Sequence, residues 1–302
     1  MVDVDGQEIA KLVERGVPID AGYVMDVGAF VADLLQPWVD GGSTTRRVTA
    51  RYAPWTATLA AWQAKYGVED RPGHAGHVSP YACLAAINAA APHDAVFAVD
   101  TGATLVWAYQ TLRALSPGAR IFSNLGNSSM GFALPAAIGA GLGKGAHHPV
   151  LCITGDGGFQ QNILELVTAA HCGLNIKVFV FNNSGYGTIK QFQNSYLGGR
   201  HAATGAADIY GKHALAGVDF VAVAQAYGVA AHRVTSLADL SPKLVQTPGL
   251  TVFDVVIHES QGIQPKLDFG NALENLSPLI ESGGDMVVDP APRFQASGWV
   301  KL

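Results

Sequence analysis

The amino-acid sequence predicts an α/β fold in which helices cover both faces of a doubly wound, mostly parallel sheet. From residue 78 to residue 257, apolar runs of strand length alternate with segments of helical periodicity. Turns rich in glycine and polar residues follow the strands, as in parallel sheets built from helical crossovers. The composition agrees, because 49% of the 302 residues are hydrophobic and only 14% are charged, which suits a compact, soluble chain.

The predicted elements follow one another in order along this region. Helices are expected at 79–91, 103–114, 131–143, 219–227 and 236–246, and strands at 95–99, 120–123, 150–154, 176–181, 229–234 and 250–257. Between the strands at 150–154 and 176–181, apolar residues at helical spacing predict a further helix over 159–172. Another helix is expected at 56–66. Right-handed crossovers between successive strands would bring the turns after them to one edge of the sheet.

Two of these turns carry residue types that suit metal and phosphate chemistry. Gly155-Asp156-Gly157-Gly158 follows one strand, and Asn182-Asn183-Ser184-Gly185-Tyr186-Gly187 follows the next. Mg²⁺ prefers oxygen ligands and often shares them with a bound phosphate. The Asp156 carboxylate, the Asn183 amide and the Gly185 carbonyl would supply three such oxygens, and the glycines would let a diphosphate approach open backbone N–H groups.

Each turn alone has a simpler interpretation. Gly-Asp-Gly is also an ordinary turn from strand to helix with aspartate as N-cap, and Asn-Asn-Ser-Gly is also an ordinary loop. The pair is more specific, because a strand precedes each turn and 24 residues separate Gly157 from Asn182. The sequence therefore predicts a site for a divalent metal and a diphosphate.

The pair of turns resembles the thiamine-diphosphate (ThDP) fingerprint of the pyruvate decarboxylase and acetohydroxyacid synthase superfamily. Two further stretches agree with this resemblance. Residues 99–104 are similar to the turn that touches the cofactor's diphosphate, and residues 128–140 are similar to the segment that underlies the cofactor. The resemblance covers residues 78–270 and implies the diphosphate-binding domain of such an enzyme.

The resemblance also implies a set of cofactor contacts. The Ser128 carbonyl would face the aminopyrimidine, and Met130 would hold the cofactor in its bent shape, although an ordinary core methionine is the alternative. The expected cofactor-binding residues are Gly102, Ala103, Thr104, Ser128, Met130, Gly155, Asp156, Gly157, Gly158, Asn183, Gly185, Tyr186, Gly187 and Thr188. Asp156, Asn183 and Gly185 are the expected Mg²⁺ ligands.

The segment after the second turn bears on the reaction. In the family it lines the substrate pocket, so Ile189 and Gln193 are expected there, although a surface glutamine is the alternative for Gln193. Pyruvate decarboxylases carry a glutamate where this chain has Ile189, and an apolar residue cannot transfer a proton. The resemblance therefore implies an acetolactate-synthase-like carboligase that acts on 2-oxo acids. A two-subunit sulfopyruvate- or phosphonopyruvate-type decarboxylase and a non-catalytic ThDP-binding subunit are the alternatives.

The domain organisation is expected to be incomplete. Residues 1–40 resemble the end of the family's central domain, 41–77 a linker, 78–270 the diphosphate-binding domain, and 271–302 a tail. In the family such tails often lie across the active-site entrance, so Phe269–Met286 is expected as part of a lid, with a surface extension as the alternative. FAD, which some relatives bind in the central domain, cannot be judged from so short a part of it.

No part of the chain resembles the family's pyrimidine-binding domain, which carries the glutamate that activates ThDP. Glu8, Glu14, Glu69 and Glu165 match other parts of the fold. The catalytic glutamate is therefore expected on a second chain, in a hetero-oligomer with at least two copies of each half. The initial methionine favours a chain of a two-chain enzyme over a fragment.

Charge and cysteine content exclude other classes. The net charge of −5 leaves no basic footprint for nucleic acid, and no apolar run reaches membrane-spanning length or follows a signal-peptide pattern. Cys83, Cys152 and Cys172 are odd in number and lack paired spacing, which predicts free thiols in a reducing cytoplasm.

Overall fold

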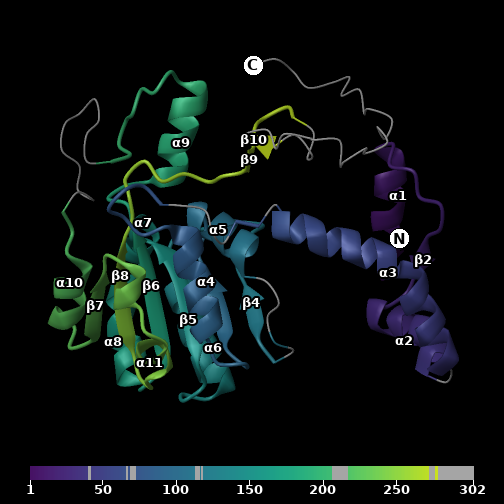
Figure 1. Cartoon of the computed structure of the whole chain (residues 1–302), viewed down its shortest axis with the longest axis horizontal. Helices are drawn as coiled ribbons and strands as arrows, with labels where there is room; N and C mark the ends of the chain where they lie inside the picture. The colour runs from purple at the N-terminus through teal and green to yellow at the C-terminus, as the bar shows by residue number, and fades with distance from the viewer. Residues whose placement is uncertain are drawn as a thin grey trace. The chain divides into compact units, whose positions relative to one another are not determined.

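The computed structural model forms two compact units, Met1–Gly67 and Val68–Leu302 (Figure 1). The boundary between them falls inside the stretch 41–77 that the sequence predicts as a linker. The structure describes residues 1–39, 42–65, 67–68, 73–112, 116, 118–205, 217–271 and 276–277. Most of the predicted tail and lid lies outside these residues. Within them, no helix has both the length and the apolar character that a membrane span needs.

The described residues of the first unit form two short parallel strands and three helices. Its elements are β1 (Val2–Asp3), α1 (Gly6–Glu14), β2 (Tyr23–Val24), α2 (Val27–Val39) and α3 (Gly42–Lys65). Asp5 caps α1, because its carboxylate accepts a hydrogen bond from the Gln7 N–H at 2.8 Å. The helix expected at 56–66 is much longer than the apolar spacing predicts, since α3 begins at Gly42 and includes Pro54.

The second unit contains a six-stranded sheet in which every neighbouring pair is parallel, in the order β4-β3-β5-β6-β8-β7. The strands are β3 (Val96–Val99), β4 (Arg120–Phe122), β5 (Val150–Gly155), β6 (Ile176–Asn182), β7 (Ala230–Val234) and β8 (Thr251–Val256). A separate antiparallel pair is formed by β9 (Lys266–Leu267) and β10 (Leu276–Ser277). The predicted fold class is confirmed.

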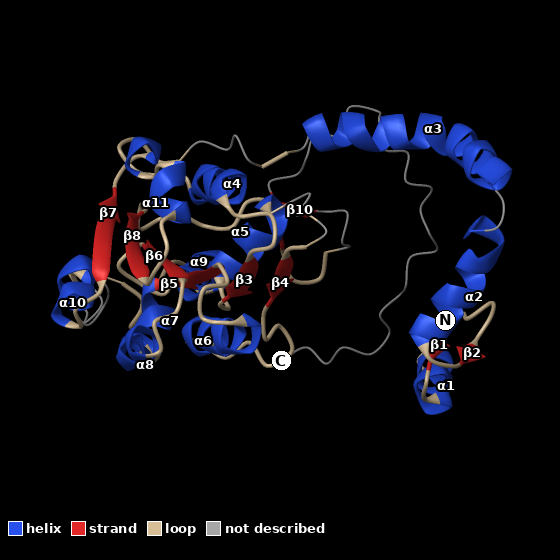
Figure 2. Cartoon of the chain, turned by 90° about the horizontal axis from the view of Figure 1, so that it is seen from below, coloured by secondary structure: helices blue, strands red, loops and turns tan. Residues whose placement is uncertain are grey.

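Helices lie on both faces of this sheet (Figure 2). The helices of this unit are α4 (Pro80–Ala90), α5 (Ala103–Thr111), α6 (Ala133–Lys144), α7 (Asp156–Gln161), η1 (Ile163–Glu165), α8 (Leu166–His171), α9 (Gly187–Tyr196), α10 (Phe220–Ala226), η2 (Leu237–Asp239) and α11 (Pro242–Gln246). Of these, α9 lies at the carboxyl edge of the sheet and not on a face (Figure 1). One core cluster joins the sheet to α4, α5 and α11, and the other joins it to α6, α7, α8 and α10.

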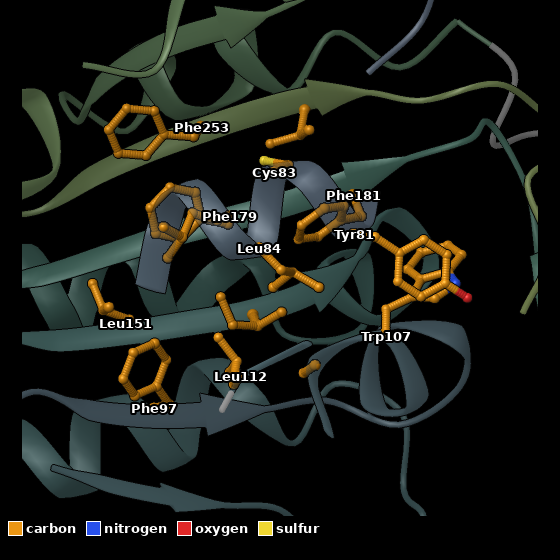
Figure 3. Close-up of a cluster of buried hydrophobic side chains, with 14 of the residues drawn as sticks. Tyr81, Cys83, Leu84, Phe97, Trp107, Leu112, Leu151, Phe179, Phe181 and Phe253 are labelled. Carbon is orange, nitrogen blue, oxygen red and sulfur yellow. The ribbon is translucent and has the colours of Figure 1, made fainter. Parts of the chain in front are cut away.

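Successive side chains along each strand point to opposite faces of the sheet, and on β6 both sets are mostly apolar. On β6, Phe179 and Phe181 belong to the cluster under α4 and α5, whereas Val178 and Val180 belong to the opposite cluster. Figure 3 shows the first cluster, in which Phe179 stacks on Phe253 of the adjacent strand with ring centroids 4.8 Å apart. A strand that is covered on both faces must be mostly apolar, which is why β6 is an apolar run whose only charged residue is Lys177.

Two predicted helices are interrupted. The segment expected to be helical over 159–172 forms α7, η1 and α8, because Asn162 leaves helical geometry with φ −135°. The Asn162 side chain instead donates to the Gly131 carbonyl at 2.8 Å. The segment 236–246 is divided into η2 and α11, and Ser241 and Pro242 form a new helix start between them.

The sheet order leaves a crevice between β3 and β5. The chain leaves β3 through α5 to reach β4 on one side, and returns through α6 to β5 on the other side. Such a reversal separates the connections at the carboxyl ends of the two strands, where α/β proteins bind their ligands. The turn after β6 adjoins the same edge.

Candidate cofactor site

A cavity of about 350 Å³ lies at this carboxyl edge of the sheet. All fourteen residues that the sequence predicts as cofactor contacts line it, together with Ile189. They come from the turns after β3, β5 and β6, from the segment before α6 and from the start of α9. The fold thus brings together residues that lie as much as 86 positions apart, from Gly102 to Thr188.

Asp156 joins the two motif turns directly. Its carboxylate accepts one hydrogen bond from the Gly157 N–H at 2.8 Å and another from the Gly185 N–H at 2.9 Å. Burial raises the pKa of Asp156 to about 6, although these N–H groups act in the opposite direction. A bound cation would favour the ionised form of the Asp156 carboxylate, so this residue is suited to bind a metal ion.

Glycines are required in these turns because neighbouring atoms occupy the space of a side chain. A Cβ on Gly157 would lie 2.6 Å from the Tyr186 ring, and a Cβ on Gly158 would lie 2.8 Å from a carboxylate oxygen of Asp100. A Cβ on Gly187 would lie 2.6 Å from the amide nitrogen of Asn183. Close packing therefore favours glycine at these three positions, and their backbone lines the cavity without side chains.

Met130 lies in a strained segment at the cavity wall. Ser128 has φ +51° and Gly131 has φ +83°, so the chain passes through left-handed geometry on both sides of the methionine. The Met130 side chain is 41% exposed, and its methyl carbon lies 3.2 Å from the place of a Gly157 Cβ. An ordinary core methionine would be buried, so this alternative does not describe Met130.

Gln193 does not line the cavity. Its side chain is only 7% exposed, and its amide donates to the Ala202 carbonyl at 3.2 Å and accepts from the Thr204 hydroxyl at 2.9 Å. Ile189, one turn earlier on α9, does line the cavity and is 52% exposed. The two residues that the sequence assigns to the substrate pocket thus have different surroundings.

Four lining residues were not among the predicted contacts. Asp100 and Thr101 directly precede the predicted residue Gly102, and Phe181 directly precedes the second motif. Trp107 lies one helical turn after Ala103, so helical periodicity alone would have found it. Trp107 also belongs to the core cluster of Figure 3, and its indole N–H donates to the Gly262 carbonyl at 3.3 Å.

The segment after β8 forms part of the surrounding structure. Gln191 of α9 donates to the Ile263 carbonyl and accepts from the Ile263 N–H, both at 3.0 Å. On the other side, the Tyr81 hydroxyl donates to the Gln264 carbonyl at 2.6 Å. Figure 1 shows this segment running from β8 beside α9. These bonds connect α9 to α4 and restrain the helix that carries Ile189.

Comparison with known proteins identifies the family. Residues 100–255 match the family model described as "Thiamine pyrophosphate enzyme, C-terminal TPP binding domain". The chain belongs to this family. Thiamine pyrophosphate is another name for ThDP, so membership implies ThDP as the cofactor.

Relatives of known function support this assignment. The chain is 30% identical to the acetolactate synthase large subunit of Cyanidium caldarium over 274 residues, which are 90% of this chain and 44% of that protein. It is 27% identical to the acetolactate synthase large subunit of Corynebacterium glutamicum over an alignment of 307 positions, which covers 97% of this chain and 46% of that protein. The chain therefore spans less than half the length of these relatives.

A solved structure gives a similar result. Benzoylformate decarboxylase from Polynucleobacter necessarius superposes with a TM-score of 0.54 and 25% sequence identity. The match covers 64% of this chain and 35% of that protein. Both comparisons concern enzymes of which this chain corresponds to one part.

Proposed function

We propose that this chain supplies the diphosphate- and metal-binding half of the active site of an acetolactate-synthase-like carboligase. The enzyme would use ThDP and Mg²⁺ to decarboxylate a 2-oxo acid and join the remaining fragment to a second carbonyl. The observation that carries this proposal is the bond between the two motif turns at Asp156, inside one cavity lined by all fourteen expected contacts.

The donor set fits Mg²⁺ and a diphosphate. Asp156 offers carboxylate oxygens, Asn183 an amide oxygen and Gly185 a backbone carbonyl, which are the hard ligands that Mg²⁺ prefers. Asp156 has a raised pKa in this structure, and bound Mg²⁺ would lower it by favouring the charged form. Gly157 and Gly158, which lie in the first turn of α7, would leave the backbone open toward the phosphates.

The organic part of the cofactor would lie against a more apolar wall. Met130, Trp107, Phe181 and Ile189 contribute apolar side chains to the lining of the cavity. When bound, ThDP supplies the electron sink that makes loss of carbon dioxide from a 2-oxo acid possible. The role of the chain is to orient the cofactor, hold its charged end and keep an apolar surface beside the reacting carbon.

Ile189 supports carboligation over simple decarboxylation. Its side chain lines the cavity and carries no group that can transfer a proton to a carbanion. With ThDP bound, the cofactor would supply a carbon nucleophile, and Ile189 would offer it no proton, so a second carbonyl could serve as the acceptor to give a 2-hydroxy-3-oxo acid or an acyloin. The likeness to benzoylformate decarboxylase supports a second candidate, a two-chain 2-oxo acid decarboxylase that would release an aldehyde.

The active site would be completed by a second chain with a pyrimidine-binding domain. Among the described residues, the carboxylates that line the cavity are Asp100 and Asp156, and no glutamate lines it. Met130 and Ile189 line the cavity and are exposed apolar side chains, which suits a covering protein surface. The relatives are more than twice as long as the matched region, so the match leaves more than half of each relative without a counterpart.

Calorimetric titration with ThDP tests the cofactor site. We expect binding that requires Mg²⁺, and a loss of at least about 100-fold in Asp156→Asn, because an amide replaces the charged metal ligand. Asp94→Asn is the matched control, since Asp94 lies before β3 at the opposite edge of the sheet. ThDP binding that does not depend on Mg²⁺, or an Asp156→Asn variant with unchanged ThDP affinity, would contradict the proposed site.

A turnover assay with pyruvate tests the remaining claims. The chain would be assayed alone and together with proteins that co-purify with it from its host. Carbon dioxide release only with a partner supports the two-chain enzyme, and the product then separates acetolactate from acetaldehyde. Turnover by the chain alone would contradict the need for a partner. Binding of ThDP without turnover under any condition would favour a non-catalytic subunit.

A further inference from the structure

Asp100 accepts hydrogen bonds from several segments around the cavity. It follows β3 and is only 2% exposed. One carboxylate oxygen accepts from the Thr101 N–H at 2.8 Å and from the Gly131 N–H at 3.1 Å. The other accepts from the Thr154 hydroxyl at 2.9 Å and from the Ala133 N–H at 3.5 Å. A single side chain thus connects the ends of β3 and β5 with the segment that carries Met130.

These three segments do not depend equally on the carboxylate. Thr154 lies in β5, where it is in register with Val180 of β6, so the sheet holds it in place. Thr101 is the next residue in the chain after Asp100. The segment from Ser128 to Phe132 lies between β4 and α6, and Ala133 is the first residue of α6, so no strand ladder holds this segment. The bonds from Asp100 therefore matter most for this segment.

The backbone at Gly131 is held from two sides. Its N–H donates to Asp100, and its carbonyl accepts from the Asn162 side chain at 2.8 Å. Its φ of +83° is strained for most residues, and a Cβ there would lie 2.6 Å from the Cβ of Gln161. Met130 directly precedes this fixed residue, so the position of its side chain follows from the position of Gly131.

The Asp100 carboxylate also lies next to the turn at residues 155–158. A Cβ on Gly158 would lie 2.8 Å from the same Asp100 oxygen that accepts from Thr154. The Met130 methyl carbon lies 3.2 Å from the place of a Gly157 Cβ. The spacing between the methionine and the motif turn is therefore set within one connected group of contacts.

We propose that Asp100 is a positioning residue that fixes Met130 over the Gly157 turn, and thereby shapes the space for the organic half of the cofactor. This inference rests on the proposed function, because it assumes that ThDP occupies the cavity. Asp100 acts through the 128–133 segment and is not assigned a contact with the cofactor.

Hydrogen exchange without any ligand is the first test. Asp100→Ala removes all four bonds, so amide exchange in 128–133 should become at least about tenfold faster. Asp100→Asn is the conservative comparison, because its carbonyl can keep the two shortest N–H bonds and its amide can donate to the Thr154 hydroxyl. Exchange in this variant should stay close to wild type. Equal exchange in all three proteins would overturn the proposal.

Binding measurements then separate the two halves of the cofactor. In the presence of Mg²⁺, Asp100→Ala should weaken ThDP binding by at least about tenfold and inorganic pyrophosphate binding by less than about threefold. Asp100→Asn should recover most of the ThDP affinity. Equal losses for both ligands would overturn the proposal. If the wild-type chain binds neither ligand, the proposed function fails instead.

A double-mutant cycle tests whether Asp100 acts through Met130. Adding Asp100→Ala to Met130→Ala should weaken ThDP binding by less than about twofold further, because the side chain being positioned is already gone. Additive losses would overturn the proposal. If Asp100→Ala does not fold, Asn162→Leu breaks the bond on the other side of Gly131 and should give the same exchange pattern and the same selective loss of ThDP binding.

Discussion

Replacing Gly185 with alanine tests how tightly the second motif turn is packed. A Cβ at this position would overlap the carbonyl oxygen of Thr204 and would lie 3.0 Å from the Cα of Gly205. Both neighbours are backbone atoms, so no side-chain rotation relieves the overlap. The alanine can be accommodated only if the turn or the 204–205 segment moves.

Either response lowers the free energy of unfolding by a similar amount. If the Thr204 carbonyl stays in place, the overlap costs about 1–3 kcal/mol, the usual range for overpacking. If it moves, the Tyr186 N–H loses its bond to this carbonyl at 3.0 Å, and the Thr204 hydroxyl loses its bond to Gln193. Two such bonds are worth about 1–3 kcal/mol together.

Calorimetry can measure the effect as a change in Tm. A loss of about 1–3 kcal/mol corresponds to a decrease of about 2–12 °C in a domain of this size. Gly139→Ala is the matched control, because Gly139 lies inside α6 with open space around its Cβ position, and the alanine should stabilise the helix by up to about 1 kcal/mol. A Tm for Gly185→Ala within about 1 °C of wild type would refute the packing argument.

Three further outcomes can be measured. Burial lowers the pKa of Lys177 from 10.5 to about 8, so the unfolded chain binds more protons between these pH values and stability should rise with pH across this window. Urea unfolding at pH 8 and pH 10 should show less of this rise in Lys177→Met, and an identical rise would contradict the assignment. Burial also raises the pKa of Cys83 to about 12 and raises that of Cys152, while Cys172 is partly exposed. A thiol reagent should therefore label one cysteine rapidly in the folded chain and all three in denaturant, and two rapid reactions would argue against this packing. Phe253→Ala removes a fully buried, stacked ring and should lower the free energy of unfolding by about 3–5 kcal/mol, visible as a lower urea midpoint; an unchanged midpoint would count against the described core.

The strands were predictable because burial on both faces leaves a strong signal in the sequence. The run at 150–154 corresponds to β5 (Val150–Gly155), and the run at 176–181 corresponds to β6 (Ile176–Asn182). The interruption of the helix at Asn162 was not predictable from local spacing. Its cause is a hydrogen bond to Gly131, which lies 31 positions earlier and is brought near only by the fold.

The candidate site shows the same contrast. The motif turns were predictable because the residues themselves suit a metal and a diphosphate, and the carboxyl edge of a parallel sheet brings such turns together. Gln193 was expected in the pocket because the resemblance places this stretch of the family there, with a surface glutamine as the alternative. In the structure its amide instead bonds to Ala202 and Thr204, in the segment after α9, which helical spacing cannot indicate.

Two buried aspartates, Asp100 and Asp156, stabilise segments that line the cavity by the same kind of hydrogen bond. Each accepts a backbone N–H from a segment with left-handed residues: Asp156 from Gly185, next to Ser184 with φ +55°, and Asp100 from Gly131. Their roles should differ in charge, because only Asp156 is proposed to face a cation. The neutral isostere tests this difference directly: Asp100→Asn should keep most of the ThDP affinity, and Asp156→Asn should lose it. If the two variants lost affinity to the same degree, a purely structural role for both carboxylates would explain the site better than a metal ligand beside a positioning residue.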